Sequence, residues 1–286
     1  MDTVQKRLTK EYLARLELLS LNIKNRANAG YAGARKSNAK GNALEFADFR
    51  DYAHGDDIRR IDWNSFGRFD KLFIKLFTEE KQARVNIFLD VSRSMDFGEK
   101  FVFAKLAAAS IAYIAIKNAD NVHVFCCTDR LTVQKANVTS KSLFTDLVRF
   151  LDEVEAEGQT SLANVLREGG GLWLGQGISF IISDFFFPDG VEEIVKLLQS
   201  KRQQVGLIHV LDESEINPTT ENALRLIDIE NSQSLDIFID TQTRKMYQAT
   251  LQNFQNELRR FCEKRGVHYA FATSGTNILK LLTTLA

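Results

Sequence analysis

The hydrophobic pattern of the chain changes at about residue 84. From there, short apolar runs typical of buried strands alternate with segments of helical spacing. We expect strands at 85–90, 121–127, 178–183, 204–211 and 267–272, and helices at about 100–117, 141–153, 161–172, 190–200, 247–265 and 276–284. The run at 131–133 predicts a short antiparallel edge strand. The alternation predicts an α/β fold, a doubly wound and mostly parallel sheet with helices on both faces.

The first 81 residues do not follow this alternation. Apolar positions from about 4 to 25 have helical spacing, and residues 25–42 are rich in Gly, Ala, Asn, Lys and Arg, which predicts a basic loop. Residues 44–80 mix charged and aromatic side chains and contain a strand-like run at 72–77. We therefore predict two parts, an N-terminal extension at 1–81 and an α/β domain at 82–286.

Composition narrows the function classes. Lys plus Arg and Asp plus Glu both number 37, so no net charge points to nucleic acid or an anionic membrane. No apolar run approaches the ~20 residues of a membrane-spanning helix, and the N-terminus has no signal-peptide pattern. Three cysteines, with Cys126 and Cys127 adjacent, favour reduced thiols and a cytoplasmic location. We expect these two to be core and surface positions of a strand.

Oxygen-bearing side chains follow the first predicted strand of the α/β domain. Asp90, Ser92 and Ser94 lie on the loop at its carboxyl end, where ligands bind in open α/β sheets. One carboxylate and two hydroxyls suit a hard cation. Thr160, before a helical run, and Asp184, at the end of another apolar strand, offer further oxygens. Helix caps and turn residues are the alternative interpretation, under which no cation binds.

The order of these residues resembles a known site. D-x-S-x-S at 90–94, G-x-T-x-L at 158–162 and an apolar strand ending in S-D resemble the metal-ion-dependent adhesion site of von Willebrand factor A domains, over about 82–286. Residues 49–63 resemble the signature of the bacterial DUF58 family, in which this stretch precedes an A-type domain. Many members carry two membrane helices and an extra β-domain, so the chain is similar to the shorter members.

The resemblance implies a ligand set and a function. Ser92, Ser94 and Thr160 would bind Mg²⁺ directly, with Mn²⁺ or Ca²⁺ as alternatives, while Asp90 and Asp184 act partly through water. The remaining position would take water or an acidic side chain of a partner protein. The implied protein is a metal-dependent binding module and not an enzyme, with a MoxR-type AAA+ ATPase as partner by analogy. The alternatives are a metal-dependent hydrolase or phosphatase using the same cation, and a purely structural subunit.

Three further features leave alternatives open. The charges at 56–62 form either a second functional patch or a locally paired turn anchored by Ile61 and Trp63. The aromatic run at 185–187 forms either an exposed contact or part of the core. His123 and His209 lie in strand-like runs, which favours core or sheet-face positions over ligand positions.

Overall fold

A computed structural model describes residues 3–30, 44–79, 83–129, 131–159, 161–168, 176–187, 190–218, 223–227, 234–238 and 241–285. Most of the predicted basic loop therefore lies outside the described residues, as does Thr160. The chain divides into two compact units, one formed by residues 1–32 with 83–286 and the other by residues 33–82.

The larger unit contains a six-stranded sheet in the order β10-β7-β6-β3-β4-β5. Its strands are β3 (Arg84–Asp90), β4 (Asn121–Cys127), β5 (Leu131–Val138), β6 (Gly177–Ser183), β7 (Gln203–Leu211) and β10 (His268–Thr273). All neighbours run parallel except β5, which is antiparallel to β4. The five predicted core strands and the antiparallel edge strand are confirmed, and the edge strand is longer than predicted.

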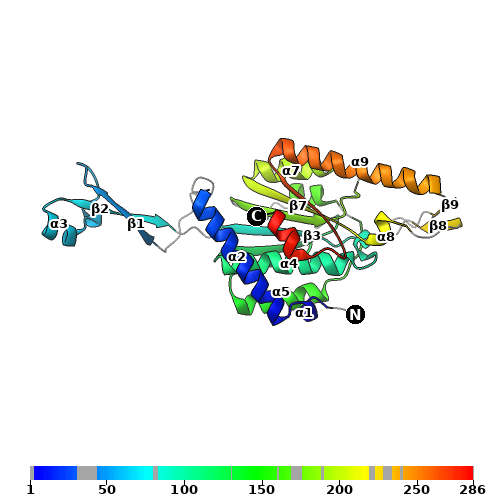
Figure 1. Cartoon of the computed structure of the whole chain (residues 1–286), viewed down its shortest axis with the longest axis horizontal. Coiled ribbons are helices and arrows are strands. Elements are labelled where there is room, and N and C mark those ends of the chain that lie inside the picture. Colours follow the sequence, from blue (N-terminus) through cyan, green and yellow to red (C-terminus); the bar gives the residue numbers. More distant parts are fainter. Residues whose placement is uncertain are drawn as a thin grey trace. The chain divides into compact units, whose positions relative to one another are not determined.

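Helices cover both faces of this sheet (Figure 1). The first face carries α1 (Val4–Arg7), α2 (Lys10–Gly30), α4 (Lys100–Lys117), α5 (Lys141–Glu153) and α10 (Ile278–Thr284). The second carries α6 (Leu162–Glu168), α7 (Val191–Ser200) and α9 (Thr241–Arg265). The predicted doubly wound α/β architecture is therefore confirmed. No helix in the described part of the chain has the length and hydrophobicity needed to cross a bilayer.

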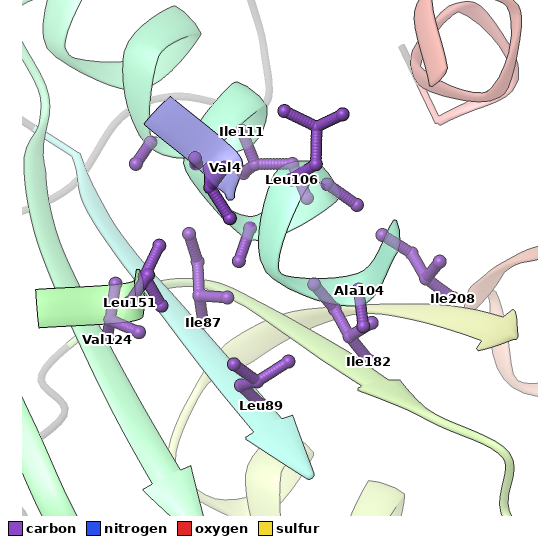
Figure 2. Close-up of a cluster of buried hydrophobic side chains, with 14 of the residues drawn as sticks. Val4, Ile87, Leu89, Ala104, Leu106, Ile111, Val124, Leu151, Ile182 and Ile208 are labelled. Atoms are coloured by element: carbon purple, nitrogen blue, oxygen red, sulfur yellow. The ribbon is translucent and has the colours of Figure 1, made fainter. Parts of the chain in front are cut away.

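Alternate residues of each central strand enter two different cores. On β3, Val85, Ile87 and Leu89 belong to the cluster under α4, whereas Phe88 belongs to the cluster under α6 and α7. Figure 2 shows Ile87 and Leu89 among the side chains of the first cluster, together with Ala104 of α4. Burial on both faces explains why these strands are continuously apolar in sequence.

The N-terminal helices belong to the α/β unit, which corrects the predicted boundary after residue 81. The Tyr12 hydroxyl lies 2.8 Å from the Ser110 hydroxyl of α4, and Ser20 donates to the Asn118 side chain at 2.8 Å. The Val4 amide donates to Asp152 of α5 at 2.7 Å. Because these contacts and the buried Val4 and Leu16 attach α1 and α2 to α4 and α5, these two helices share the core of the sheet.

The smaller unit, residues 33–82, is built on an antiparallel pair. β1 (Leu44–Asp51) pairs with β2 (Phe73–Glu79), and a 3₁₀ turn at Ile58–Arg60 and helix α3 (Trp63–Phe69) connect them. The predicted strand at 72–77 is confirmed, while β1 and α3 were not predicted. In the larger unit, a short helix α8 (Glu213–Ile216) and a hairpin of β8 (Ala223–Ile227) and β9 (Ser234–Phe238) were also not predicted.

Candidate functional site

The sheet has a topological switch between β3 and β6. From β3 the chain passes through α4 to β4 on one side, and it later returns to β6 on the other side of β3 before continuing to β7 and β10. In such sheets the loops at the carboxyl ends diverge here and leave a crevice for ligands. Asp90 is the last residue of β3, Ser183 is the last residue of β6, and Asp184 directly follows β6. Asp90 and Asp184 therefore lie at the switch.

Asp90 is buried and held on both oxygens. Its Oδ1 accepts a hydrogen bond from the Ser92 amide at 2.9 Å, and its Oδ2 accepts one from the Ser183 hydroxyl at 2.6 Å. Ser92 is fully buried, Ser94 is half-buried, and their hydroxyl oxygens lie 3.0 Å apart. The structure thus brings the three predicted residues of this loop together and adds Ser183, which links Asp90 to the neighbouring strand.

Asp184 is also buried, with 2% of its surface exposed. Its Oδ1 accepts from the Phe186 amide at 3.2 Å, while its Oδ2 accepts from the Lys100 ammonium at 2.9 Å. Phe185, between Asp184 and Phe186, has a left-handed backbone with φ of 58°, which turns the chain directly after Asp184. The turn fixes the carboxylate at the strand end.

The third predicted loop meets the first, although Thr160 itself lies outside the described residues. The Glu157 amide donates to the Val91 carbonyl at 2.7 Å, and the Arg93 amide donates to the Gly158 carbonyl at 3.1 Å. After the gap, the Ser161 amide donates to the Thr128 carbonyl at 3.1 Å. The two residues that flank 159–160 are thus bonded to the loops after β3 and β4.

Lys100 and Glu215 were not predicted as site residues. Lys100 begins α4 and is 1% exposed, and its ammonium lies 2.9 Å from Asp184 Oδ2 and 2.8 Å from Glu215 Oε1. Glu215 of α8 also accepts from the Asp212 amide at 2.7 Å as part of a capping box. A lysine at the start of a helix is usually solvent-exposed, so its sequence position gave no sign of this role.

The electrostatics of the cluster follow from burial and paired charges. Burial and the nearby Asp184 charge raise the pKa of Asp90, while hydrogen bonds from Ser183 and Ser92 partly oppose the rise. Burial lowers the pKa of Lys100, but the charges of Asp184 and Glu215 outweigh it and raise that pKa above its usual value. Two buried carboxylates close together favour a neighbouring positive charge.

The donor set fits a hard divalent cation. Oxygens bound to Mg²⁺ at about 2.1 Å in octahedral geometry lie about 3.0 Å apart when adjacent, the separation found between the Ser92 and Ser94 hydroxyls. Within the described residues, no three His, Cys, Asp or Glu side chains gather as a metal-binding group. A cation at this place would therefore depend on hydroxyl oxygens, with Asp90 and Asp184 supplying charge.

The aromatic run after Asp184 contains both a core residue and an exposed residue. Phe185 is buried in the core cluster under α7, whereas Phe186 is 47% exposed. The Phe186 ring packs against Phe254 of α9 with centroids 5.5 Å apart and against His209 at 6.2 Å. One phenylalanine thus belongs to the core, and its neighbour presents an apolar face beside the site.

The charged segment at 56–62 pairs locally. Arg50 lies 2.6 Å from Asp56, and Arg59 lies 3.1 Å from Asp57. Ile61 is buried, but Trp63 is 63% exposed, so the expectation that it anchors the segment is wrong. The local pairs favour the interpretation as a paired turn.

Histidine and cysteine positions are largely structural. His209 is fully buried within a group of aromatic rings, as expected for a core residue, and burial lowers its pKa to about 4. Cys126 and Cys127 are both buried and unpaired, which corrects the expectation that one faces the surface. The reason is that β4 is covered on both faces, so neither side of the strand meets solvent.

Comparison with known proteins gives distant structural matches. The conserved hypothetical protein BatB from Bacteroides thetaiotaomicron matches with a TM-score of 0.43 and 13% identity, covering 71% of this chain and 97% of that chain. A von Willebrand factor type A protein from Catenulispora acidiphila matches with a TM-score of 0.35 and 16% identity, covering 50% of this chain and 36% of that chain.

Sequence comparison is more decisive. The uncharacterized proteins Rv1480 of Mycobacterium tuberculosis and Mb1516 of Mycobacterium bovis are each 23% identical over 238 residues, which cover 81% of this chain and 75% of the relative. The model of the family described as "Protein of unknown function DUF58" matches residues 48–257, well over half of the chain. The protein therefore belongs to the DUF58 family.

Proposed function

We propose that this protein is a metal-dependent protein-binding module and not an enzyme. The observation that carries the proposal is the pair of hydroxyls of Ser92 and Ser94, 3.0 Å apart beside two buried carboxylates at the switch point of the sheet. Mg²⁺ is the cation this set suits best, with Mn²⁺ or Ca²⁺ as substitutes. Its direct ligands would be Ser92, Ser94 and Thr160, while Asp90 and Asp184 would orient bound water.

A coordination position left to water would accept a carboxylate from another protein. Hydroxyl ligands carry no charge, so a divalent ion here keeps residual positive charge that attracts an acidic side chain. Two partly exposed aromatic side chains would add contact area around such an acid: Phe186, two residues after Asp184, and Tyr247, which interacts electrostatically with Glu215 and Lys100. Family analogy suggests a MoxR-type AAA+ ATPase as the partner, acting in a bacterial cytoplasm.

The first test measures cation binding through its effect on the melting temperature. Wild type should melt several degrees higher in Mg²⁺ or Mn²⁺ than in EDTA, because a ligand that binds only the folded state stabilises it. Ser92→Ala/Ser94→Ala should lose this shift. Ser140→Ala, which removes a hydroxyl that caps α5, is the matched control and should keep it. An equal melting temperature of wild type in Mg²⁺, Mn²⁺ and EDTA would contradict the proposal.

The second test separates binding from catalysis. The MoxR-type ATPase of the same organism should be captured by wild type in Mg²⁺, and neither by wild type in EDTA nor by Asp90→Ala. A hydrolase or phosphatase predicts instead cation-dependent turnover of phosphoester substrates that Asp90→Ala abolishes. Such turnover would replace the binding module with the enzymatic alternative.

A further inference from the structure

A buried lysine, Lys100, already neutralises the charge of one carboxylate of the candidate site, that of Asp184. The Lys100 ammonium is 1% exposed and lies 2.9 Å from Asp184 and 2.8 Å from Glu215. The Glu215 side chain is 18% exposed, whereas that of Asp184 is 2% exposed, so the ammonium joins a fully buried carboxylate to one that reaches solvent. Burying an ammonium is costly unless carboxylates pair with it, and both partners here do so at ion-pair distance.

The position of Lys100 is fixed rather than accidental. Glu215 is held from its other oxygen by the Asp212 amide at 2.7 Å, as part of the capping box of α8. Asp184 is held from its other oxygen by the Phe186 amide at 3.2 Å. Each carboxylate therefore has one oxygen on the backbone and one on the ammonium. The lysine cannot leave Asp184 without breaking a built arrangement.

We propose that Lys100 is an internal competitor of the divalent cation and sets a low intrinsic affinity for it. The inference rests on the proposed metal site. Asp90 and Asp184 carry two formal negative charges, and the Lys100 ammonium cancels one before any ion arrives. The ion therefore gains less from the site and retains more positive charge. That residual charge is what an incoming partner carboxylate would neutralise, so Lys100 makes tight cation binding depend on the partner.

Glu215 modulates this competition. While Glu215 is charged, it shares the ammonium with Asp184 and weakens the hold of Lys100 on that carboxylate. A neutral side chain at 215 would leave Lys100 paired with Asp184 alone. The two residues should thus act in opposite directions: removing Lys100 tightens cation binding, and neutralising Glu215 loosens it.

The test measures Mn²⁺ affinity of the full chain by isothermal titration calorimetry and by the electron paramagnetic resonance signal of free Mn²⁺. Lys100→Met should lower the dissociation constant at least about tenfold, because a unit charge is removed next to the ion. Glu215→Gln should raise it about threefold. The matched control is Lys105→Met: Lys105 is also a buried lysine of α4, but it donates to the Val154 carbonyl, so affinity should change less than about twofold.

A double variant controls for misfolding of Lys100→Met. Lys100→Met leaves Asp184 and Glu215 without their counter-ion, whereas Lys100→Met/Glu215→Gln removes one charge of each sign. The double variant should bind Mn²⁺ more tightly than Glu215→Gln alone. Equal or weaker binding in both lysine variants, with wild type binding Mn²⁺ normally, would overturn the competition and leave the metal site standing. Absence of Mn²⁺ binding in wild type and in every variant would overturn both.

Discussion

At the residue scale, Ser183 connects the two halves of the candidate site. Its hydroxyl donates to Asp90 Oδ2 at 2.6 Å and accepts from the Phe185 amide at 2.9 Å. It therefore holds a carboxylate of β3 and the turn after β6 with one oxygen. Because Asp90 is buried and its pKa is raised by burial and by the Asp184 charge, each remaining donor to its carboxylate matters for stability.

Ser183→Ala should lower the free energy of unfolding by about 1–3 kcal/mol, since a buried carboxylate loses a donor. Urea unfolding measures the change. Ser179→Ala is the matched control: Ser179 is a buried serine of the same strand that bonds the neutral amide of Gln203, at 2.9 Å. Its loss should cost about 1 kcal/mol. A loss for Ser183→Ala equal to or smaller than that for Ser179→Ala would contradict the special role of the Asp90 contact.

The residues that the sequence identified are those whose position in the fold follows from strand ends. Asp90 ends one apolar strand and Asp184 directly follows another, and parallel strands place their carboxyl ends along one edge of the sheet. Lys100 and Glu215 were not predicted as site residues, because their burial depends on tertiary contacts between α4 and α8 that no local sequence pattern indicates. Trp63 was misplaced for a related reason: the burial of an aromatic side chain depends on tertiary contacts, and Trp63 is 63% exposed.

At the scale of elements, Asp212 joins three segments near the site. Its carboxylate accepts from the Ser214 amide at 3.0 Å, which caps α8, and from the Glu99 amide just before α4 at 3.1 Å. It also accepts from the Ser274 hydroxyl after β10 at 2.9 Å. One carboxylate thus positions the helices that carry Glu215 and Lys100.

Asp212 should make stability depend on pH. Partial burial raises the pKa of Asp212, but hydrogen bonds from Ser214, Glu99 and Ser274 outweigh it and lower the pKa to about 2. A carboxyl whose folded pKa lies below its unfolded value of about 3.9 stabilises the folded state above that value. This contribution is lost as pH falls from about 4 toward 2.

The measurement compares wild type with Asp212→Asn in urea at pH 6 and at pH 3. The stability difference should shrink by about 1 kcal/mol at the lower pH, a figure reduced for partial solvent screening. Asp146→Asn, on α5, is the control, because its exposed ion pair with Arg149 spans 3.8 Å and contributes little. A difference that stays constant between the two pH values would contradict the assignment.

Strands and helices were predicted correctly where the element is buried on both faces or on one continuous face. The central strands are apolar on both sides because two cores meet there, so their bounds agree within a residue. The start of α9 was missed by six residues because its first turns are polar and exposed. The β8–β9 hairpin was missed because each of its strands has only five residues, too few to show a clear period along the chain.

At the scale of the whole molecule, each of the two units buries hydrophobic residues of its own. Among the residues that the structure describes, all members of both large hydrophobic clusters, including those of α1 and α2, come from residues 1–32 or 83–286. The smaller unit buries two isoleucines, Ile61 of the loop before α3 and Ile74 of β2. Their backbones form an isolated antiparallel β-bridge. Since hydrophobic burial is the dominant favourable term in folding, the larger unit should fold without residues 33–82.

Replacing residues 33–82 with a flexible Gly/Ser linker should therefore leave a cooperative unfolding transition. We expect the melting temperature in calorimetry to fall by no more than about 5 °C, the change that roughly 1–2 kcal/mol would cause in a domain of this size. Deletion of residues 1–82 is the sharper comparison, because it also removes α1 and α2. That variant exposes the α4 face that Val4 and Leu16 cover, so it should aggregate or lose its transition. Comparable stability of the two variants would contradict the assignment of the N-terminal helices to the α/β unit.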